Sequence, residues 1–166
     1  MSNLVLIGMM GCGKTTVGQL LAQRMGWEFV DTDAYIEKRL NRAIPDLFAQ
    51  EGEEFFRGWE LRVSRELALR DHTVIACGGG LPTRPEAIAA LKASGYVVWL
   101  NRDPEEIIDT VSMAGRPLGQ GGRQAFLDRF AQREPIYRQW ADHIEEGCQS
   151  PQETADRIAA AYTEVQ

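Results

Sequence analysis

Short apolar runs alternate with longer amphipathic stretches along the whole chain. The short runs predict strands, and the longer stretches, in which apolar residues recur at helical spacing, predict helices. The expected strands cover residues 3–7, 28–31, 72–76, 96–100 and, more weakly, 143–145. The expected helices cover residues 14–25, 33–40, 53–70, 85–94, 104–110, 123–140 and 151–162. Strands that alternate with helices of this length indicate an α/β fold whose parallel sheet is covered on both faces.

The segment over residues 112–122 departs from this alternation. It contains four glycines and one proline in eleven residues and lies between two expected helices. Loops of this kind often cover active sites, so we expect a mobile lid over residues 111–122. The chain has no internal repeat, low-complexity tract or linker, and its length of 166 residues fits one domain over residues 1–166.

The composition is ordinary for a globular protein, but its charge excludes some functions. The 18 basic and 24 acidic residues leave a net charge of −6, which argues against a nucleic-acid-binding protein. No apolar stretch approaches the roughly 18 residues that would span a membrane, and the N-terminus has no signal-type segment. Cys12, Cys77 and Cys148 have neither paired nor metal-binding spacing, and free thiols suit a reducing compartment. We therefore expect a cytoplasmic protein with no nucleic-acid or membrane partner.

A phosphate-binding motif follows the first expected strand. Residues 8–15 read Gly-Met-Met-Gly-Cys-Gly-Lys-Thr and match the pattern G-x-x-x-x-G-K-[ST] between an apolar run and a helix-forming stretch. In such a loop, backbone N–H groups and the helix N-terminus face phosphate oxygens. Lys14 reaches the β- and γ-phosphates, and the Thr15 hydroxyl binds Mg²⁺. The alternative, a chance glycine turn, is much the weaker one. We expect a nucleoside triphosphate to contact Gly11, Cys12, Gly13, Lys14, Thr15 and Thr16.

Two acidic residues, Asp31 and Asp33, lie where the second strand is expected to end. Residues two apart in a strand project to the same side, about 7 Å apart. Because the carboxyl ends of parallel strands share one edge of a sheet, both carboxylates can lie beside the phosphate loop. One would lie near Mg²⁺ and the other would face the acceptor substrate. The alternative interpretation makes Asp33 a helix N-cap, which its position suits equally well.

Three consecutive glycines, Gly78, Gly79 and Gly80, follow the third expected strand. At the carboxyl edge of a parallel sheet, glycines expose backbone N–H groups to a closely approaching ligand. A plain flexible turn is the alternative.

Arginines supply the remaining candidate cations. Phosphoryl transfer requires positive charge over the γ-phosphate and, for an anionic acceptor, a fixed cation at the acceptor site. Arg57, Arg116 in the glycine-rich loop and Arg133 in the following helix are candidates. A single arginine is more often a solvated surface residue, and spacing alone does not choose among the arginines of the chain.

Taken together in order, these segments resemble the shikimate kinase family over nearly the whole chain. The phosphate loop marks only a superfamily, whereas the ordered set is far more specific. The matching segments are residues 8–18, 29–33, 44–48, 52–53, 56–60, 78–80, 116–118 and 133–137. The resemblance implies a three-layer P-loop kinase sandwich with a five-stranded parallel sheet. It also implies an acceptor-binding subdomain over residues 33–60 and a monomer.

The resemblance also implies residue roles. Asp33 contacts the attacking shikimate hydroxyl and accepts its proton, and Asp31 helps to hold Mg²⁺ through water. Arg57 and Arg133 clamp the shikimate carboxylate, and the backbone of Gly78, Gly79 and Gly80 lines the same pocket. Arg116 moves in with the lid and stabilises charge on the transferring phosphoryl group. The implied activity is transfer of the ATP γ-phosphoryl group to the 3-hydroxyl of shikimate, in aromatic amino acid biosynthesis.

The chain departs from the family pattern near the lid. The family commonly has an adenine-stacking arginine seven residues before the lid arginine, where this chain has Asp109. It also tends to continue Arg-Pro-Leu with a second leucine, where this chain has Gly119. These departures concern adenine affinity and lid order more than the reaction, because the phosphate and acceptor residues remain.

Three other functions are alternatives. A GTPase switch would carry Asp-x-x-Gly and Asn-Lys-x-Asp, and neither tetrapeptide occurs in the chain. A kinase for another acceptor, such as gluconate or a nucleotide, would share the phosphate loop but not the remaining set. A catalytically weak nucleotide-binding regulator would be consistent with Asp109 and Gly119.

Overall fold

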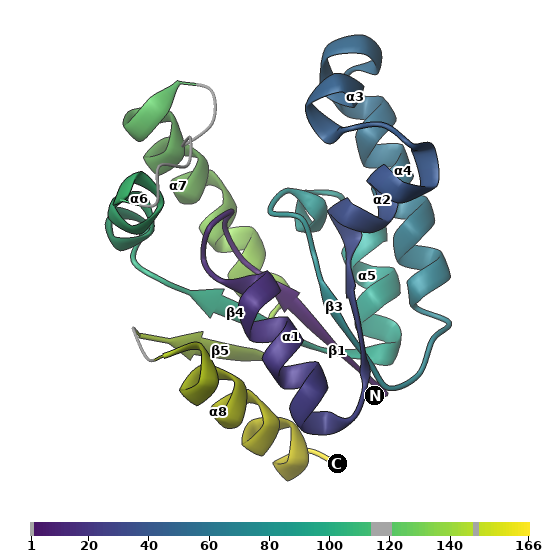
Figure 1. The fold of residues 1–166 in the computed structure, drawn as a ribbon, viewed down its shortest axis with the longest axis vertical. Coiled ribbons are helices and arrows are strands. Elements are labelled where there is room, and N and C mark those ends of the chain that lie inside the picture. The colour runs from purple at the N-terminus through teal and green to yellow at the C-terminus, as the bar shows by residue number, and fades with distance from the viewer. Residues whose placement is uncertain (1, 114–120, 148–149) are drawn as a thin grey trace.

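The computed structural model describes residues 2–113, 121–147 and 150–166, in which a central sheet is covered by helices on both faces (Figure 1). The strands of these residues are β1 (Asn3–Ile7), β2 (Glu28–Asp31), β3 (Thr73–Ala76), β4 (Gly95–Asn101) and β5 (His143–Glu146). They pair in the order β2-β3-β1-β4-β5, and every pairing is parallel. The expected α/β sandwich with a five-stranded parallel sheet is confirmed.

The helices form the two outer layers. They are α1 (Lys14–Met25), α2 (Thr32–Leu40), α3 (Ile44–Glu51), α4 (Glu53–Leu67), α5 (Pro85–Ser94), α6 (Pro104–Met113), α7 (Gly122–Trp140) and α8 (Pro151–Glu164), together with a 3₁₀ turn, η1 (Leu81–Thr83). Helices α1 and α8 pack together on one face of the sheet, and α4 and α5 pack together on the other (Figure 1). Beyond the carboxyl edge of the sheet, α2 and α3 rise on one side and α6 on the other.

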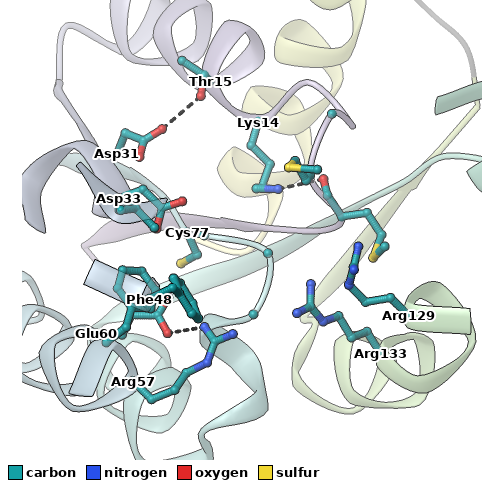
Figure 2. A pocket seen from close by; sticks show the side chains of 18 of the residues that line it. Lys14, Thr15, Asp31, Asp33, Phe48, Arg57, Glu60, Cys77, Arg129 and Arg133 are labelled. Atoms are coloured by element: carbon teal, nitrogen blue, oxygen red, sulfur yellow. Dashed lines mark hydrogen bonds and ion pairs between the residues drawn. The ribbon is translucent and has the colours of Figure 1, made fainter. Parts of the chain in front are cut away.

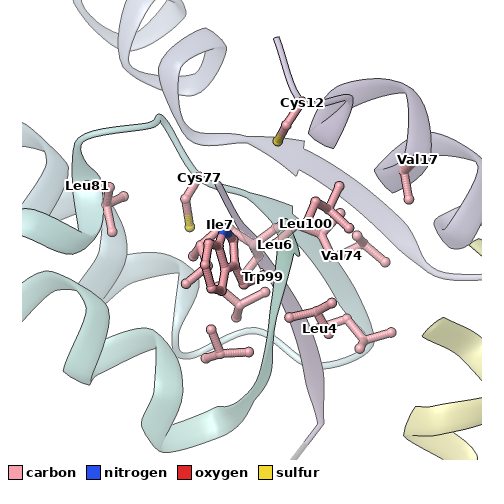
Figure 3. Packing of buried hydrophobic residues seen from close by; sticks show 14 of the residues in the cluster. Leu4, Leu6, Ile7, Cys12, Val17, Val74, Cys77, Leu81, Trp99 and Leu100 are labelled. Atoms are coloured by element: carbon pink, nitrogen blue, oxygen red, sulfur yellow. The ribbon is translucent and has the colours of Figure 1, made fainter. Parts of the chain in front are cut away.

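The central strand, β1, shows that the sheet is buried on both faces. Leu4, Val5, Leu6 and Ile7 of β1 are all fully buried, which is the continuous apolar pattern of a strand covered by helices on both sides. Trp99 from β4 packs in the same cluster (Figure 3). From β1 the chain first builds β2 and β3 on one side and then β4 and β5 on the other. In open α/β sheets, ligands bind at the carboxyl ends of the strands where the order reverses in this way.

Element boundaries differ from the sequence expectations in a few places. Helix α3 was not predicted: it has only eight residues, its N-cap Ala43 makes no side-chain hydrogen bond, and only Leu47 of the helix is buried. The helix expected over residues 53–70 ends at Leu67. His72, expected in β3, precedes it with a left-handed φ of 52°. The remaining differences are shifts of one to three residues at element ends, where helices fray.

A close approach between α1 and β2 generates a stability prediction. A Cβ at Gly18 would overlap the ring of Phe29 and lie 3.3 Å from Leu6 Cδ1. We therefore expect Gly18→Ala to lower the free energy of unfolding by about 1 kcal/mol or more, because overlap in a packed core outweighs the gain in helix propensity. Gly58→Ala is the matched control, since nothing lies within 4 Å of a Cβ there. It should raise that free energy by about 0.5–1 kcal/mol. Urea denaturation measures both, and equal stabilisation by the two changes would contradict the prediction.

Candidate active site

The phosphate loop joins β1 to α1 at the centre of the carboxyl edge. Gly11 and Gly13 have φ of 85° and 101°, a left-handed conformation that glycine adopts without strain. Gly13 is the N-cap of α1 and caps it with no side chain, so the N-terminus of the helix opens toward a ligand. The Lys14 Nζ donates to the carbonyls of Gly8 (2.7 Å) and Met9 (2.9 Å), which holds the ammonium against the loop. The loop therefore presents a cation and unpaired N–H groups, which together suit an anion.

Asp31 connects the loop to α2. The Thr15 hydroxyl donates to Asp31 Oδ2 at 3.0 Å, and the backbone N–H of Ala34 donates to Asp31 Oδ1 at 3.1 Å. Asp31 is thus the N-cap of α2, and the alternative interpretation of Asp33 as the cap is wrong. The strand argument for these two carboxylates is also wrong, because β2 ends at Asp31 and Asp33 lies in the first turn of α2. They nevertheless line one cavity.

Asp33 is a mostly buried carboxyl group whose pKa is raised to about 6. Burial is the main cause, the negative charge of Asp31 adds to it, and Lys14 and Arg57 act in the opposite direction. Within the described part of the chain, Asp33 Oδ1 is buried and has no hydrogen-bond partner. A buried carboxylate oxygen without a partner costs free energy, so this atom is available to a ligand that can donate a hydrogen bond.

Arg57 extends from α4 into the cavity and is held there by Glu60, an acid to which the sequence analysis gave no role. Its Nη1 donates to Glu60 Oε1 at 2.6 Å, one helical turn away. Glu60 is fully buried, and burial raises its pKa to about 7 although the charge of Arg57 opposes the shift. Phe48 and Phe56 flank the guanidinium at 6.0 and 5.6 Å from the ring centroids. The i,i+3 spacing of Arg57 and Glu60 was the signal available in the sequence.

Arg133 enters from α7 on the opposite side of the cavity (Figure 2). Burial lowers its pKa below the usual arginine value, and the charges of Arg57 and Arg129 act in the same direction. One turn further along α7, the buried Tyr137 hydroxyl donates to the carbonyl of Gly79 at 2.6 Å. Burial raises the pKa of Tyr137 to about 12, so the hydroxyl stays protonated as a donor. This contact fixes α7 against the glycine turn.

These elements enclose one cavity of about 750 Å³. The predicted site residues that line it are Gly11, Gly13, Lys14, Thr15, Thr16, Asp31, Asp33, Arg57, Gly78, Gly79, Gly80 and Arg133. The Cys12 side chain is buried, with its Sγ 3.8 Å from Lys14 Nζ, and does not line the cavity. Arg116 and most of the expected lid lie outside the described residues. Of that segment, residues 111–113 belong to α6 and Gly122 begins α7. The lining residues that sequence analysis did not assign include Glu60, Phe48, Phe56 and Arg129.

The described residues lack two further features, which concern metals and membranes. They contain no group of three or more His, Cys, Asp or Glu side chains that could hold a metal ion by themselves. None of their helices is both long enough and apolar enough to cross a bilayer.

Comparisons with known proteins agree with one another. A family model described as shikimate kinase matches residues 10–163. A shikimate kinase from Symbiobacterium thermophilum is 46% identical over 149 residues, which cover 86% of this chain and 84% of the relative. The solved structure of a shikimate kinase from Acinetobacter baumannii in complex with shikimate superposes with a TM-score of 0.92 at 35% identity and covers 100% of this chain and 95% of that one. A shikimate kinase from Aquifex aeolicus superposes with a TM-score of 0.84 at 32% identity and covers 97% of this chain and 96% of that one.

The raised pKa of Asp33 predicts how stability depends on pH. The folded protein holds the proton up to about pH 6, whereas the unfolded chain releases it near 3.8. The unfolded state therefore binds fewer protons between these values, and this group's contribution to stability is lost as the pH rises through about 6. Asp33→Asn removes the buried charge, so we expect it to be more stable than wild type by about 3 kcal/mol at pH 8, with little gain at pH 4. Urea denaturation at both pH values measures this difference.

Asp71→Asn is the matched control, because Asp71 is exposed. It should leave the pH dependence of stability unchanged. A gain for Asp33→Asn of the same size at both pH values would show that the raised pKa is not its cause.

Proposed function

Because the chain belongs to the shikimate kinase family, we propose that its cavity transfers the γ-phosphoryl group of ATP to the 3-hydroxyl of shikimate. The products are ADP and shikimate 3-phosphate, an intermediate of aromatic amino acid biosynthesis. The chain is thus an ATP-dependent small-molecule kinase. The observation that carries the proposal is that the phosphate loop, Asp33 and two arginines from different helices line the same cavity.

The phosphate loop is the proposed ATP site. The backbone of residues 11–16 and the N-terminus of α1 bind the phosphates, and Lys14 turns from its own loop carbonyls to the β- and γ-phosphate oxygens. Thr15 and Asp31, which are already hydrogen-bonded to each other, are the proposed Mg²⁺ ligands, with Asp31 acting through water. A pair of oxygen ligands suits this ion, because Mg²⁺ keeps several waters and takes its other ligands from substrate phosphates. When bound, Mg²⁺ neutralises charge on the β- and γ-phosphates.

The acceptor is proposed to bind between α4 and α7. Its carboxylate lies between Arg57 and Arg133, whose forked guanidinium groups match two carboxylate oxygens. Glu60 holds Arg57 in place by the 2.6 Å contact without entering the clamp itself. Phe48 and Phe56 line the same cavity and offer apolar surface to the ring of the acceptor. The acceptor subdomain proposed over residues 33–60 corresponds to α2, α3 and the first half of α4.

Asp33 is the proposed proton acceptor for the attacking hydroxyl. Its pKa of about 6 leaves it ionised at neutral pH but close enough to that pH to take a proton as the O–P bond forms. Its unpartnered oxygen is free to accept the hydrogen bond of the hydroxyl. Arg116 and the lid proposed between α6 and α7 would add positive charge over the transferring group.

The remaining proposals concern the setting of the protein. The buried thiols of Cys12 and Cys77 are free, which favours a reducing compartment and supports a cytoplasmic location. A net charge of −6 argues against a nucleic-acid partner. We propose a monomer, because every residue that carries the proposed reaction, apart from Arg116 and the buried Cys12, lines one cavity of a single chain.

The test of the function is ADP formation from Mg·ATP by purified protein in the presence and absence of shikimate. Shikimate-dependent ADP release with equimolar shikimate 3-phosphate is the expected result. ADP formation with gluconate or a nucleoside monophosphate, but not with shikimate, would identify a kinase for another acceptor. Nucleotide binding without ADP formation from any acceptor would instead favour a regulator, and either outcome would overturn the proposal.

The carboxylate clamp generates a kinetic prediction. We expect Arg133→Ala to raise the KM for shikimate by about 10- to 100-fold, because a charge-assisted contact to the carboxylate is lost. The KM for ATP should change by less than about twofold. Initial-rate kinetics with each substrate varied in turn separates these effects. Equal increases in both KM values would contradict the assignment of Arg133 to the acceptor.

A further inference from the structure

Arg129 is a third arginine in the cavity wall, and neither the sequence motifs nor the clamp uses it. It precedes Arg133 by four residues on α7, a spacing that places both side chains on one face of the helix. Both line the cavity, and Figure 2 shows both guanidinium groups entering it from the same side. In that view, Arg129 lies on the side of Arg133 that is nearer to Lys14 and the phosphate loop.

The half-buried Arg129 lacks the acidic partner that most arginines of this protein have. Across residues 2–113, 121–147 and 150–166, no carboxylate lies within 4.0 Å of its guanidinium, and no hydrogen bond satisfies it. By contrast, Arg24, Arg39 and Arg42 are all paired with acids at the surface. Arg129 also adds positive charge beside Arg133, whose pKa it helps to lower. Like charges that face one cavity repel, and an anion bound between them relieves the repulsion.

The charge of the ligand indicates which anion Arg129 serves. The acceptor carries a single carboxylate, and the guanidinium groups of Arg57 and Arg133 are already proposed to bind it. Phosphorylation adds a charge of about −1.5 to −2 at neutral pH, together with three oxygens that accept hydrogen bonds. A third cation therefore adds little to binding of the acceptor but much to binding of the phosphorylated product and of the transition state before it. Interactions that strengthen only as the reaction proceeds increase the rate rather than the affinity for substrate.

We propose that Arg129 binds the phosphoryl group as it passes from ATP to the acceptor oxygen and then retains it on the product. The inference rests on the proposed function. In the step concerned, a bond forms between the acceptor oxygen and the γ-phosphorus, and the bond from that phosphorus to the bridging β-phosphate oxygen breaks. ADP leaves with the bonding electron pair, and the hydroxyl proton passes to Asp33. Arg129 donates hydrogen bonds throughout and loses no proton.

The experiment compares Arg129→Gln and Arg129→Lys with wild type. Steady-state kinetics gives kcat and both KM values, and isothermal titration gives Kd for shikimate and for shikimate 3-phosphate. We expect Arg129→Gln to lower kcat by about 10- to 100-fold and to weaken shikimate 3-phosphate binding about tenfold or more. Its Kd and KM for shikimate should stay within about twofold of wild type. Arg129→Lys, which keeps the charge but not the fork, should recover part of both losses.

Arg65→Gln is the matched control, because Arg65 is an exposed arginine of α4 that does not line the cavity and its loss changes the net charge equally. It should leave every constant unchanged. Thermal unfolding of each variant shows whether the fold is intact.

Three results would overturn the inference about Arg129. The first is that Arg129→Gln keeps wild-type kinetics and wild-type affinity for the product. The second is that it weakens the binding of shikimate and of shikimate 3-phosphate equally, which would show that Arg129 binds the carboxylate. A rise confined to the KM for ATP would assign it to the bound nucleotide instead. In each of these cases wild type still forms ADP with shikimate, so the proposed function survives. If wild type forms no ADP with shikimate, the proposed function fails and this inference fails with it.

Discussion

Each glycine of the turn after β3 leaves space that a functional side chain occupies. A Cβ at Gly78 would lie 2.5 Å from Asp33 Oδ1, one at Gly79 would lie 3.2 Å from Arg133 Nη1, and one at Gly80 would overlap the guanidinium of Arg57. The acid and the two arginines come from three different helices, α2, α7 and α4. They converge because this stretch of backbone has no side chains of its own.

The same turn is held rigid by a second set of contacts. The N–H of Gly78 donates to the Thr32 hydroxyl at 2.9 Å, the carbonyl of Gly79 accepts from Tyr137 at 2.6 Å, and the carbonyl of Gly80 accepts from Thr83 at 2.5 Å. Every glycine of the turn thus has at least one anchoring hydrogen bond as well as one functional side chain beside it. A turn with this composition would otherwise be flexible, so these hydrogen bonds restrain the wall of the cavity beside Asp33, Arg57 and Arg133.

How far the sequence predicts the site depends on whether each signal is local. The strand, the glycine-rich loop and the helix that follows it form one continuous motif, and the strand and the helix lie where the sequence predicted them. Asp33 lines the same cavity as Asp31, as expected, but the argument for it was wrong, because the β2 strand ends two residues earlier and Asp31 caps α2. Spacing did not distinguish Arg57 and Arg133 from the other arginines, and only the family resemblance selected them. Glu60 and Arg129 were missed because burial of an acid and lack of an ion pair arise only once distant helices have packed.

Local charge, rather than net charge, explains how an acidic protein can receive anionic substrates. The net charge of −6 describes the whole surface, whereas the cavity wall holds four basic residues, Lys14, Arg57, Arg129 and Arg133, against three acidic ones, Asp31, Asp33 and Glu60. The raised pKa values of Asp33 and Glu60 reduce the negative contribution further at mildly acidic pH. Basic residues therefore outnumber acidic ones in the wall of the cavity, although the chain as a whole is acidic. An overall charge that argues against one class of anion is thus compatible with a site built for another.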